Sequence, residues 1–267
     1  MNLGFQFKQF FVKHDKCAMK VGTDGVLLGA WTPTGECKMQ NAKCKILDVG
    51  TGSGLIALML AQRCPEAQID AIDIDPDAVA QARENFASSP WSARLHVSQC
   101  ALQDWQMSND KCQMTNDKCQ MTNDKCQISN DKLYDLIVSN PPYFTASLKN
   151  PDAARCTARH NDTLPFSVLI AESAKLLAPD GTLALIVPAE AEPELQALAE
   201  AQGLQCTHRC YVHPKPDRPA KRVMLAWQCS DFEIREIREI RTDHLTLEDA
   251  HGARSLAYQY LTRDFYL

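Results

Sequence analysis

Short apolar runs alternate with longer amphipathic stretches along most of the chain. The runs that predict strands cover residues 45–49, 68–72, 94–97, 134–138, 182–187, 206–212 and 222–227. Apolar residues three or four positions apart predict helices over residues 55–63, 77–86, 166–177 and 193–201. This alternation predicts a doubly wound α/β fold with a mostly parallel seven-stranded sheet. No helix separates the last two strands, so we expect them to form an antiparallel hairpin at one edge of the sheet.

The pattern breaks at residues 107–132, where a seven-residue unit containing NDKCQ repeats. The Met and Cys positions of each copy fit neither helical nor strand spacing, so the repeat has no apolar face to bury. We expect it to be a polar loop inserted between two strands. The remaining chain predicts one domain over residues 1–267, with a substrate-side extension at 1–35 and a C-terminal tail at 230–267.

The composition is that of an ordinary globular protein, with 45% apolar and 23% charged residues and a net charge of −5. No apolar run approaches the about 18 residues that span a bilayer, and the N-terminus has no secretory signal, so we expect a cytoplasmic protein with no membrane partner. Its twelve cysteines are then expected to be reduced. Cysteines of the repeat lie far apart, and Cys206, His208 and Cys210 are spread along one strand, so no metal site is predicted.

Two short stretches are basic against the acidic balance of the chain. Residues 1–20 hold four lysines, one aspartate and several phenylalanines, and residues 213–222 hold four basic residues and one aspartate. Basic residues mixed with aromatic rings suit a surface that follows a nucleic-acid backbone and stacks on bases. A solvated edge above core phenylalanines is the alternative. The candidate RNA-binding residues are Lys8, Lys13, Lys215, Arg218, Lys221 and Arg222.

The first predicted strand runs into the glycine-rich sequence LDVGTGSGLIA at residues 47–57. Read from Gly52, it satisfies the dinucleotide pattern G-x-G-x-x-A, and Asp73 or Asp75 lies about 20 residues further on. Asp48 favours S-adenosylmethionine instead, because a carboxylate before the loop repels a pyrophosphate and attracts a sulfonium cation. On that interpretation the cofactor-binding residues are Asp48, Gly50, Thr51, Gly52, Gly54, Asp73 and Ile74.

The strand at 134–138 is followed by SNPPYF at residues 139–144. Pro141 and Pro142 cannot donate ladder hydrogen bonds, so the strand must stop there. In this kind of sheet the strand lies next to the first one, which brings Asn140 near the cofactor loop. The Asn140 side-chain oxygen and the Pro141 carbonyl could accept both hydrogens of a ring-bound amino group and aim its lone pair, while Tyr143 stacks on the ring. These four residues are the candidate catalytic residues; a simple strand-ending turn is the alternative.

The motifs DVGTGSG, IDAIDID and SNPPYF resemble those of amino-group methyltransferases with an N-P-P-Y signature. Residues 7–31, FKQFFVKHDKCAMKVGTDGVLLGAW, and 213–225, HPKPDRPAKRVML, resemble more narrowly the bacterial enzymes that N6-methylate adenine 37 in the anticodon loop of a valine tRNA. The resemblance covers nearly the whole chain apart from the repeat and the tail. It implies a class I, Rossmann-like methyltransferase fold, S-adenosylmethionine as cofactor and tRNA, with valine tRNA favoured, as partner. The sequence leaves the oligomeric state unknown, and a monomer is favoured. Ala101 departs from the pattern, since relatives often carry an adenine-binding acid there, and Asp104 follows three residues later.

Four other functions compete with this one. N-P-P-Y also serves enzymes that methylate adenine in DNA or glutamine in release factors, but the glutamine enzymes carry a longer helical domain than residues 1–44 can hold. Relatives that act on guanine usually have phenylalanine at the place of Tyr143. A tRNA-binding protein without catalysis would show damage to the glycine loop or to Asn140, and both are intact.

Overall fold

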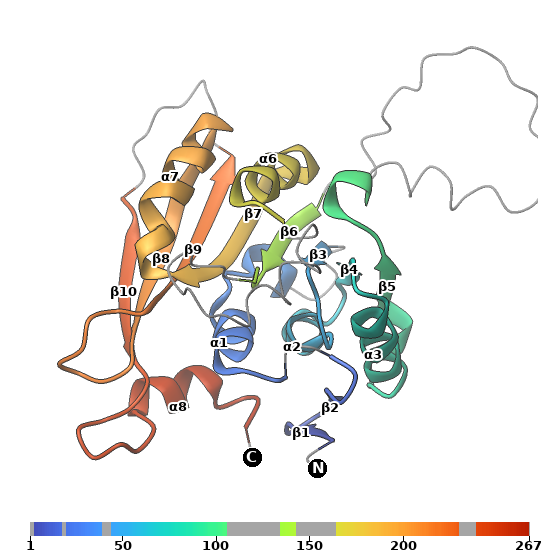
Figure 1. Cartoon of the computed structure of the whole chain (residues 1–267), viewed down its shortest axis with the longest axis horizontal. Helices are drawn as coiled ribbons and strands as arrows, with labels where there is room; N and C mark the ends of the chain where they lie inside the picture. Colours follow the sequence, from blue (N-terminus) through green and yellow to red (C-terminus); the bar gives the residue numbers. More distant parts are fainter. Residues whose placement is uncertain are drawn as a thin grey trace, which may run out of the picture.

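The computed structural model describes residues 3–17, 20–38, 44–105, 134–142, 164–229 and 239–266. An eight-stranded sheet runs through it in the order β10-β8-β9-β7-β6-β3-β4-β5 (Figure 1). The strands are β3 (Lys45–Val49), β4 (Gln68–Asp73), β5 (Leu95–Gln99), β6 (Tyr134–Ser139), β7 (Leu177–Pro188), β8 (Leu204–His213), β9 (Arg222–Cys229) and β10 (Arg241–Thr246). The five strands from β7 to β5 pair in parallel, so the predicted doubly wound, mostly parallel α/β fold is confirmed.

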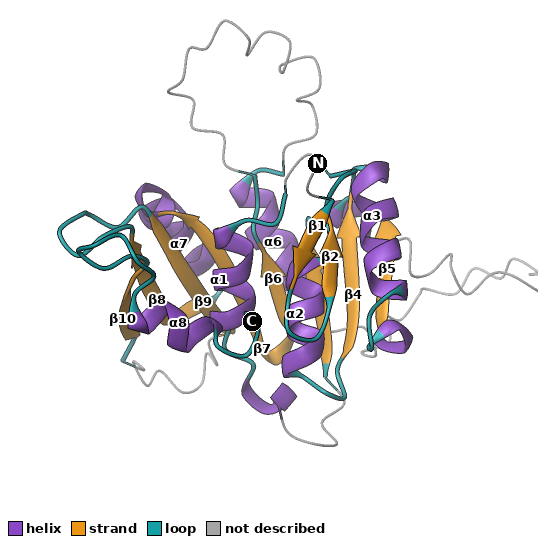
Figure 2. Ribbon diagram, turned by 90° about the horizontal axis from the view of Figure 1, so that it is seen from below, coloured by secondary structure: helices purple, strands orange, loops and turns teal. Residues whose placement is uncertain are grey.

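Helices cover both faces of this sheet (Figure 2). They are α1 (Thr23–Trp31), α2 (Leu55–Arg63), α3 (Pro76–Ala87), α6 (Phe166–Leu176), α7 (Glu192–Ala201) and α8 (Leu256–Thr262). Neighbouring residues of a strand point to opposite faces, so Ile46 packs with the cluster of α1 and α2 while Leu47 packs with that of α6 and α7. Both clusters are apolar, which is why the central strands read as continuous hydrophobic runs.

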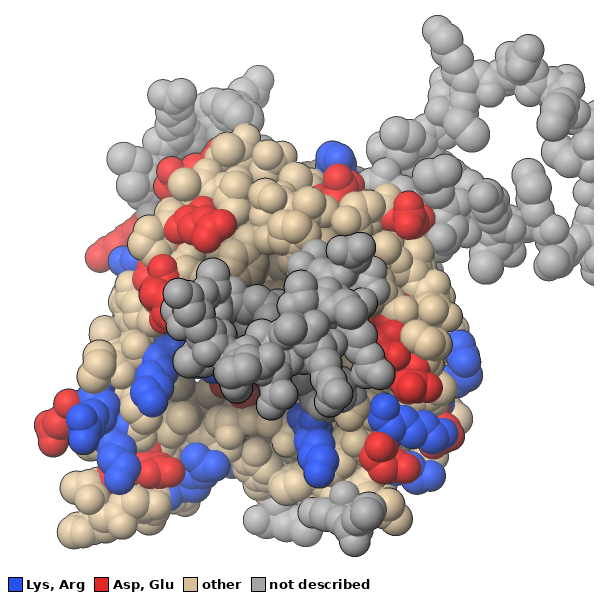
Figure 3. Space-filling model, viewed as in Figure 1, with Lys and Arg blue, Asp and Glu red and all other residues tan. Residues whose placement is uncertain are grey.

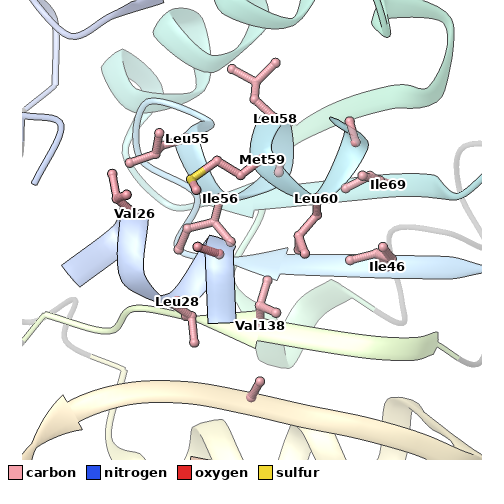
Figure 4. Close-up of a cluster of buried hydrophobic side chains, with 14 of the residues drawn as sticks. Val26, Leu28, Ile46, Leu55, Ile56, Leu58, Met59, Leu60, Ile69 and Val138 are labelled. Carbon is pink, nitrogen blue, oxygen red and sulfur yellow. The ribbon is translucent and has the colours of Figure 1, made fainter. Parts of the chain in front are cut away.

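Helix α1 packs closely against α2 in the larger of these clusters. Figure 4 shows Val26 and Leu28 of α1 gathered around Ile56 and Met59 of α2, while Ile46 of β3 lies further along the same cluster beside Leu60. A Cβ atom at Gly29 would lie 2.7 Å from the Met59 sulfur, so only glycine allows this approach. Because α1 is buried from residue 25 to residue 30, its sequence lacks the polar face that marks a surface helix, and no helix is predicted there.

The predicted strand count and the edge position of the hairpin are wrong. Strands β8 and β9 do form an antiparallel hairpin, but β10 adds an eighth strand outside β8 and runs parallel to it. Its sequence RTDHLT buries only Leu245, because an edge strand has water along one side and needs no apolar run. Part of the stretch predicted as a tail thus forms the sheet edge and α8.

Two of the N-terminal phenylalanines belong to the core. Residues 4–13 form a two-stranded hairpin of β1 (Gly4–Gln6) and β2 (Phe11–Lys13). Between these strands Phe7 and Phe10 are buried and stack with centroids 4.6 Å apart, and Phe7 also stacks on Tyr266 at 5.8 Å. The two chain ends therefore lie together (Figure 1). Phe7 and Phe10 are therefore core residues, as in the alternative interpretation of the sequence, and are not available to stack on bases.

The repeat at 107–132 lies outside the described residues, but the residues on either side of it are joined. Trp105 donates a hydrogen bond from Nε1 to the Tyr134 hydroxyl at 3.0 Å, and that hydroxyl donates to Asp70 at 2.9 Å. The described residues on the two sides of the repeat therefore lie next to each other, where β6 begins.

Some of the other expectations concern what the chain lacks. Within the described ranges, no helix is long and apolar enough to cross a bilayer, and no group of three or more metal-binding side chains comes together. The eight cysteines in the same ranges are free thiols.

Candidate active site

A cavity of about 420 Å³ opens at the carboxyl ends of β3, β4, β5 and β6. Its wall is mostly apolar and is formed by the glycine loop after β3, the end of β4 with Ile74 and Asp75, residues 100–103 after β5, and residues 139–142 at the end of β6. Ligands of doubly wound sheets bind beyond the carboxyl ends of the strands, so the cavity lies where this fold places its site.

The glycine loop folds back onto β4. Backbone N–H groups of Gly50 and Thr51 both donate to the Ile72 carbonyl, at 2.9 and 3.1 Å. Gly50, Gly52 and Gly54 have φ of 69°, 55° and 82°, in the left-handed region that favours glycine. Gly50 and Gly52 line the cavity, whereas a Cβ at Gly54 would lie 2.5 Å from the Phe86 ring. Gly54 is therefore required by packing, and it is not among the residues that line the cavity.

Asp48 lies behind the loop and is fully buried. Its Oδ2 accepts hydrogen bonds from the Thr51 hydroxyl at 2.7 Å and from the Ala57 N–H at 3.2 Å. Burial raises the pKa of Asp48 to about 7, against the lowering effect of these two hydrogen bonds. Neither Asp48 nor Thr51 lines the cavity, so both shape the loop behind it. Asp48 can influence a ligand in the cavity only electrostatically, without direct contact.

Replacing Asp48 with asparagine is expected to stabilise the protein more at high pH than at low pH. The pKa of Asp48 is about 7 in the folded protein, above the ordinary 3.8, so the folded state binds the proton more tightly. That stabilisation is complete below the ordinary pKa and is lost as the pH rises through about 7. Wild-type stability should fall relative to Asp48→Asn by at most about 1.4 kcal/mol per pH unit across this window. Urea unfolding between pH 5 and pH 8 measures the difference, and a difference that stays constant contradicts it.

Asp73 stands at the end of β4 and lines the cavity. Its Oδ2 accepts a backbone hydrogen bond from Gly52 at 2.9 Å, and its Oδ1 accepts one from Asp75 at 3.0 Å. Burial raises the pKa of Asp73, and the backbone hydrogen bonds oppose that shift. A carboxylate offers about four acceptor positions on its two oxygens, so Asp73 can also accept a hydrogen bond from a ligand hydroxyl. Beside it, the Ile74 side chain is 43% exposed and offers the cavity an apolar surface.

The SNPP sequence closes the opposite side of the cavity. Ser139 donates from its hydroxyl to the Val49 carbonyl at 2.8 Å, which ties the end of β6 to the end of β3. Val49 and Ser139 are partners in the register, so Asn140 follows β6 at the level where Gly50 follows β3. Asn140, Pro141 and Pro142 line the cavity, and Tyr143 lies outside the described residues.

Several residues of the wall were not predicted from the sequence. Ala101 lines the cavity, as does Gln103, whereas Asp104 does not. Cys17 joins them from the N-terminal segment, and Leu164 from the residues before α6. Ala101 and Gln103 reach the wall because they follow the carboxyl end of β5, beside β4, whereas Cys17 and Leu164 reach it through the packing of distant segments.

The basic residues predicted to bind RNA do not form one surface. Lys8 donates to the Arg263 carbonyl at 2.6 Å near the C-terminus, and Lys13 lies 3.9 Å from Glu84. The other four belong to the β8–β9 connection and the start of β9. Since β8 runs parallel to β6, this connection lies at the same end of the sheet as Asn140, where the parallel strands finish. These four residues are Lys215, Arg218, Lys221 and Arg222.

Within this connection the basic side chains differ in their partners. Arg222 is bound to Asp24 of α1 at 2.9 Å, and Lys215 lies 3.9 Å from Glu248. Arg218 and Lys221 are exposed. In Figure 3 lysines and arginines lie interspersed with acidic side chains on this face. Arg222 therefore serves the fold, and Arg218 and Lys221 are better placed for a phosphate.

Known proteins resemble this chain over almost its whole length. A family model described as a methyltransferase domain matches residues 46–125. The tRNA1(Val) (adenine(37)-N6)-methyltransferase of Parabacteroides distasonis is 45% identical over 263 residues, which cover 98% of this chain and 97% of that protein. The protein of the same name from Erwinia tasmaniensis is 42% identical over 265 residues, covering 99% and 95%.

Solved structures agree with the fold. A predicted O-methyltransferase from Agrobacterium tumefaciens superposes with a TM-score of 0.61 at 17% identity, over 90% of this chain and 96% of that one. A putative class I S-adenosylmethionine-dependent methyltransferase from Listeria monocytogenes gives a TM-score of 0.53 at 13% identity, over 85% and 64%. The predicted methyltransferase fold is thereby confirmed, and with it the family implied by the motifs. The chain belongs to the family of the tRNA1(Val) (adenine(37)-N6)-methyltransferases.

Proposed function

We propose that the protein transfers a methyl group from S-adenosylmethionine to N6 of an adenine in tRNA, at position 37 of the anticodon loop of a valine tRNA. The observation that carries this proposal is the full-length similarity to relatives of that name, at up to 45% identity. The cavity supports it, because Asn140 and Pro141 lie there together with the glycine loop and Asp73.

The charges around the cavity fit S-adenosylmethionine better than a dinucleotide. Asp48 is buried behind the loop, and its Oδ1 has no hydrogen-bond partner among the residues that the structure describes. A bound cation favours the ionised forms of Asp48 and of Asp73 in the wall, whereas a pyrophosphate would meet repulsion from the same two acidic groups. The Gly50 and Gly52 backbone, Asp73 and Ile74 would hold the cofactor, which supplies an electrophilic methyl carbon on a positively charged sulfur.

Asn140 and Pro141 prepare the adenine. The N6 lone pair is delocalised into the ring, which makes the amino group a poor nucleophile. The Asn140 side-chain oxygen and the Pro141 carbonyl accept its two hydrogens, draw the nitrogen out of conjugation and direct its lone pair. Tyr143 would stack on the adenine taken out of the loop. The methylated nitrogen is acidic enough to lose its proton without a charged general base.

The competing substrates make different predictions. An adenine in DNA and a glutamine amide could offer similar amino groups to Asn140, but the named relatives match this chain along its whole length and not in the core alone. A monomer, a cytoplasmic location and the division at residues 35, 107–132 and 230 stay predictions.

Nucleoside mass spectrometry tests the proposal. The protein is incubated with labelled S-adenosylmethionine and either a valine tRNA transcript or the same transcript with adenine 37 changed to guanine. We expect N6-methyladenosine in the anticodon-loop fragment of the first and none in the second. Equal labelling of both transcripts, or labelling of duplex DNA or protein glutamine instead, would contradict the proposed substrate.

Changing Lys221 to glutamate is expected to weaken tRNA association in a salt-dependent way. Lys221 is exposed at the end of the sheet where Asn140 lies. A contact between Lys221 and a tRNA phosphate would release counterions from the RNA. Losing one contact should reduce the slope of log affinity against log salt by about 0.7 to 0.9. Filter binding between 50 and 200 mM salt, about the range over which such effects are large, measures this slope.

Lys175→Glu is the matched control for Lys221→Glu. Lys175 is 57% exposed, and its ion pair, with Glu172 at 2.8 Å, lies within α6 and joins no other element. It lies in the last turn of α6, just before the first residue of β7 and hence at the amino ends of the parallel strands. It undergoes the same charge change and should leave the slope unchanged. Equal slopes of log affinity against log salt for the two variants would mean that Lys221 of the β8–β9 connection makes no tRNA contact. Arg222 is unsuitable for the test, because its replacement also breaks the bond to Asp24.

A further inference from the structure

Helix α3 holds the N-terminal segment, residues 13–17, against the cofactor cavity through two buried amides. Asn85 is 2% exposed, and its Oδ1 accepts a hydrogen bond from the Lys13 N–H at 2.9 Å. Its Nδ2 donates to the Lys13 carbonyl at 2.9 Å and to the Ser53 carbonyl of the glycine loop at 2.8 Å. One side chain thereby joins the N-terminal segment, α3 and the loop that borders the cavity.

Gln81 extends this arrangement by one helical turn. It is fully buried on the same face of α3, and its Oε1 accepts a hydrogen bond from the Lys16 N–H at 3.0 Å. At the helix surface the Lys16 ammonium pairs with Glu84. Three consecutive contacts from α3 therefore fix the path of the segment up to the residue before Cys17.

Cys17 is the point at which this path meets the cavity. It lines the wall together with Asp73 and Asp75. Burial, with a smaller contribution from those two carboxylates, raises the pKa of Cys17 to about 11, so the thiol stays protonated and apolar at neutral pH. The segment thus closes the cavity on the side of Asp73, where the cofactor ribose is placed by the proposed function.

We propose that Asn85 is a positioning residue for methyl transfer, which couples the closed state of the N-terminal segment to the conformation of the glycine loop. The inference rests on the proposed function for the identity of the cofactor. A primary amide is required, since the position must accept one hydrogen bond and donate two. An aspartate of the same shape keeps the acceptor, loses both donors and sets a carboxylate against two carbonyl oxygens.

Two measurements on Asn85→Asp test the coupling. Calorimetry with S-adenosylhomocysteine should show affinity reduced about tenfold, since buried hydrogen bonds are lost beside the loop. Limited trypsin digestion should cleave after Lys13 and Lys16 faster than in the wild type, because both lysines lie in the released segment. The KM for S-adenosylmethionine should rise by about the same factor while kcat changes less, a pattern that simple loss of folded protein does not produce.

Arg83→Ala is the control, because Arg83 is exposed on α3 and should change neither quantity. If Asn85→Asp does not fold, Gln81→Leu carries the test, because it removes only the acceptor for Lys16; faster cleavage with weaker binding supports the coupling. The coupling would be overturned if a folded Asn85→Asp or Gln81→Leu variant were cleaved faster in the N-terminal segment and still bound S-adenosylhomocysteine with wild-type affinity. Unchanged cleavage would also overturn it. If tRNA is not methylated but Asn85→Asp still weakens S-adenosylhomocysteine binding, the proposed substrate fails and the coupling stands.

Discussion

Asn140→Ala is expected to lower the rate of methyl transfer by about 10²- to 10³-fold, the usual loss for one positioned polar group in a site of this kind. Asn140 lines the cavity at the end of β6, and Ser139 ties that end to β3 through the Val49 carbonyl. The alanine variant keeps this tie, the Pro141 carbonyl and the glycine loop. The amino group then has one acceptor instead of two, so its lone pair remains largely in the ring.

Single-turnover kinetics separates this loss from a loss of binding. With saturating tRNA and cofactor, the rate constant of Asn140→Ala should fall while the dissociation constants for tRNA and S-adenosylhomocysteine stay near those of the wild type. A wild-type rate constant in the bound complex would reduce SNPPYF to a strand-ending turn. An equal loss of affinity and rate would mean that Asn140 binds substrate and does not activate it.

Asp73→Ala is expected to weaken binding of S-adenosylhomocysteine by about 10²-fold. Each hydrogen bond to a charged group contributes about 1.5 to 3 kcal/mol, and a carboxylate in the cavity wall can accept such a bond from a ribose hydroxyl. The variant also removes the acceptor for the Gly52 N–H, which loosens the loop on the same side of the cavity. Calorimetry measures the affinity, and it should show NAD binding more weakly than S-adenosylhomocysteine to the wild type.

Asp77→Ala is the matched control for Asp73. Asp77 lies in the first turn of α3, four residues beyond Asp73, and is exposed outside the cavity wall. It should leave the affinity for S-adenosylhomocysteine within about twofold, as surface substitutions usually cost little. Unchanged affinity in Asp73→Ala, or tighter binding of NAD, would mean that the loop serves a different ligand.

Most of the sheet and its helices follow from local patterns in the sequence. The bounds of β3 and α2 agree with the prediction, because a strand buried on both faces is a continuous apolar run and a helix against it repeats every three to four residues. The site residues that follow directly on strand ends were equally accessible: Gly50 and Gly52 after β3, Asp73 at the end of β4 and Asn140 after β6 all line the cavity. Parallel strands bring their carboxyl ends to the same end of the sheet. The position of these residues along each strand is therefore enough to predict that they lie together.

Other features depend on contacts between segments far apart in the chain. The sequence left open whether Phe7 and Phe10 stack on bases or enter the core. Both are buried, since Phe7 packs on Tyr266 and Phe10 packs on Phe7. Strand β10 has only Leu245 as a buried residue, and its pairing with β8 is decided by the sheet edge beside it. Local propensity carries no information about such partners, since the free energy comes from surfaces buried between the segments.

The same distinction applies within the site. Asp48 and Gly54 belong to the glycine motif, yet the fold turns Asp48 toward Thr51 and Ala57 and sets Gly54 against Phe86, so neither lines the cavity. Cys17 reaches the wall only because Asn85 and Gln81 of α3 bind the backbone before it. A motif specifies which residues are near a turn, whereas the direction of each side chain depends on hydrogen-bond partners that tertiary packing brings within about 3 Å.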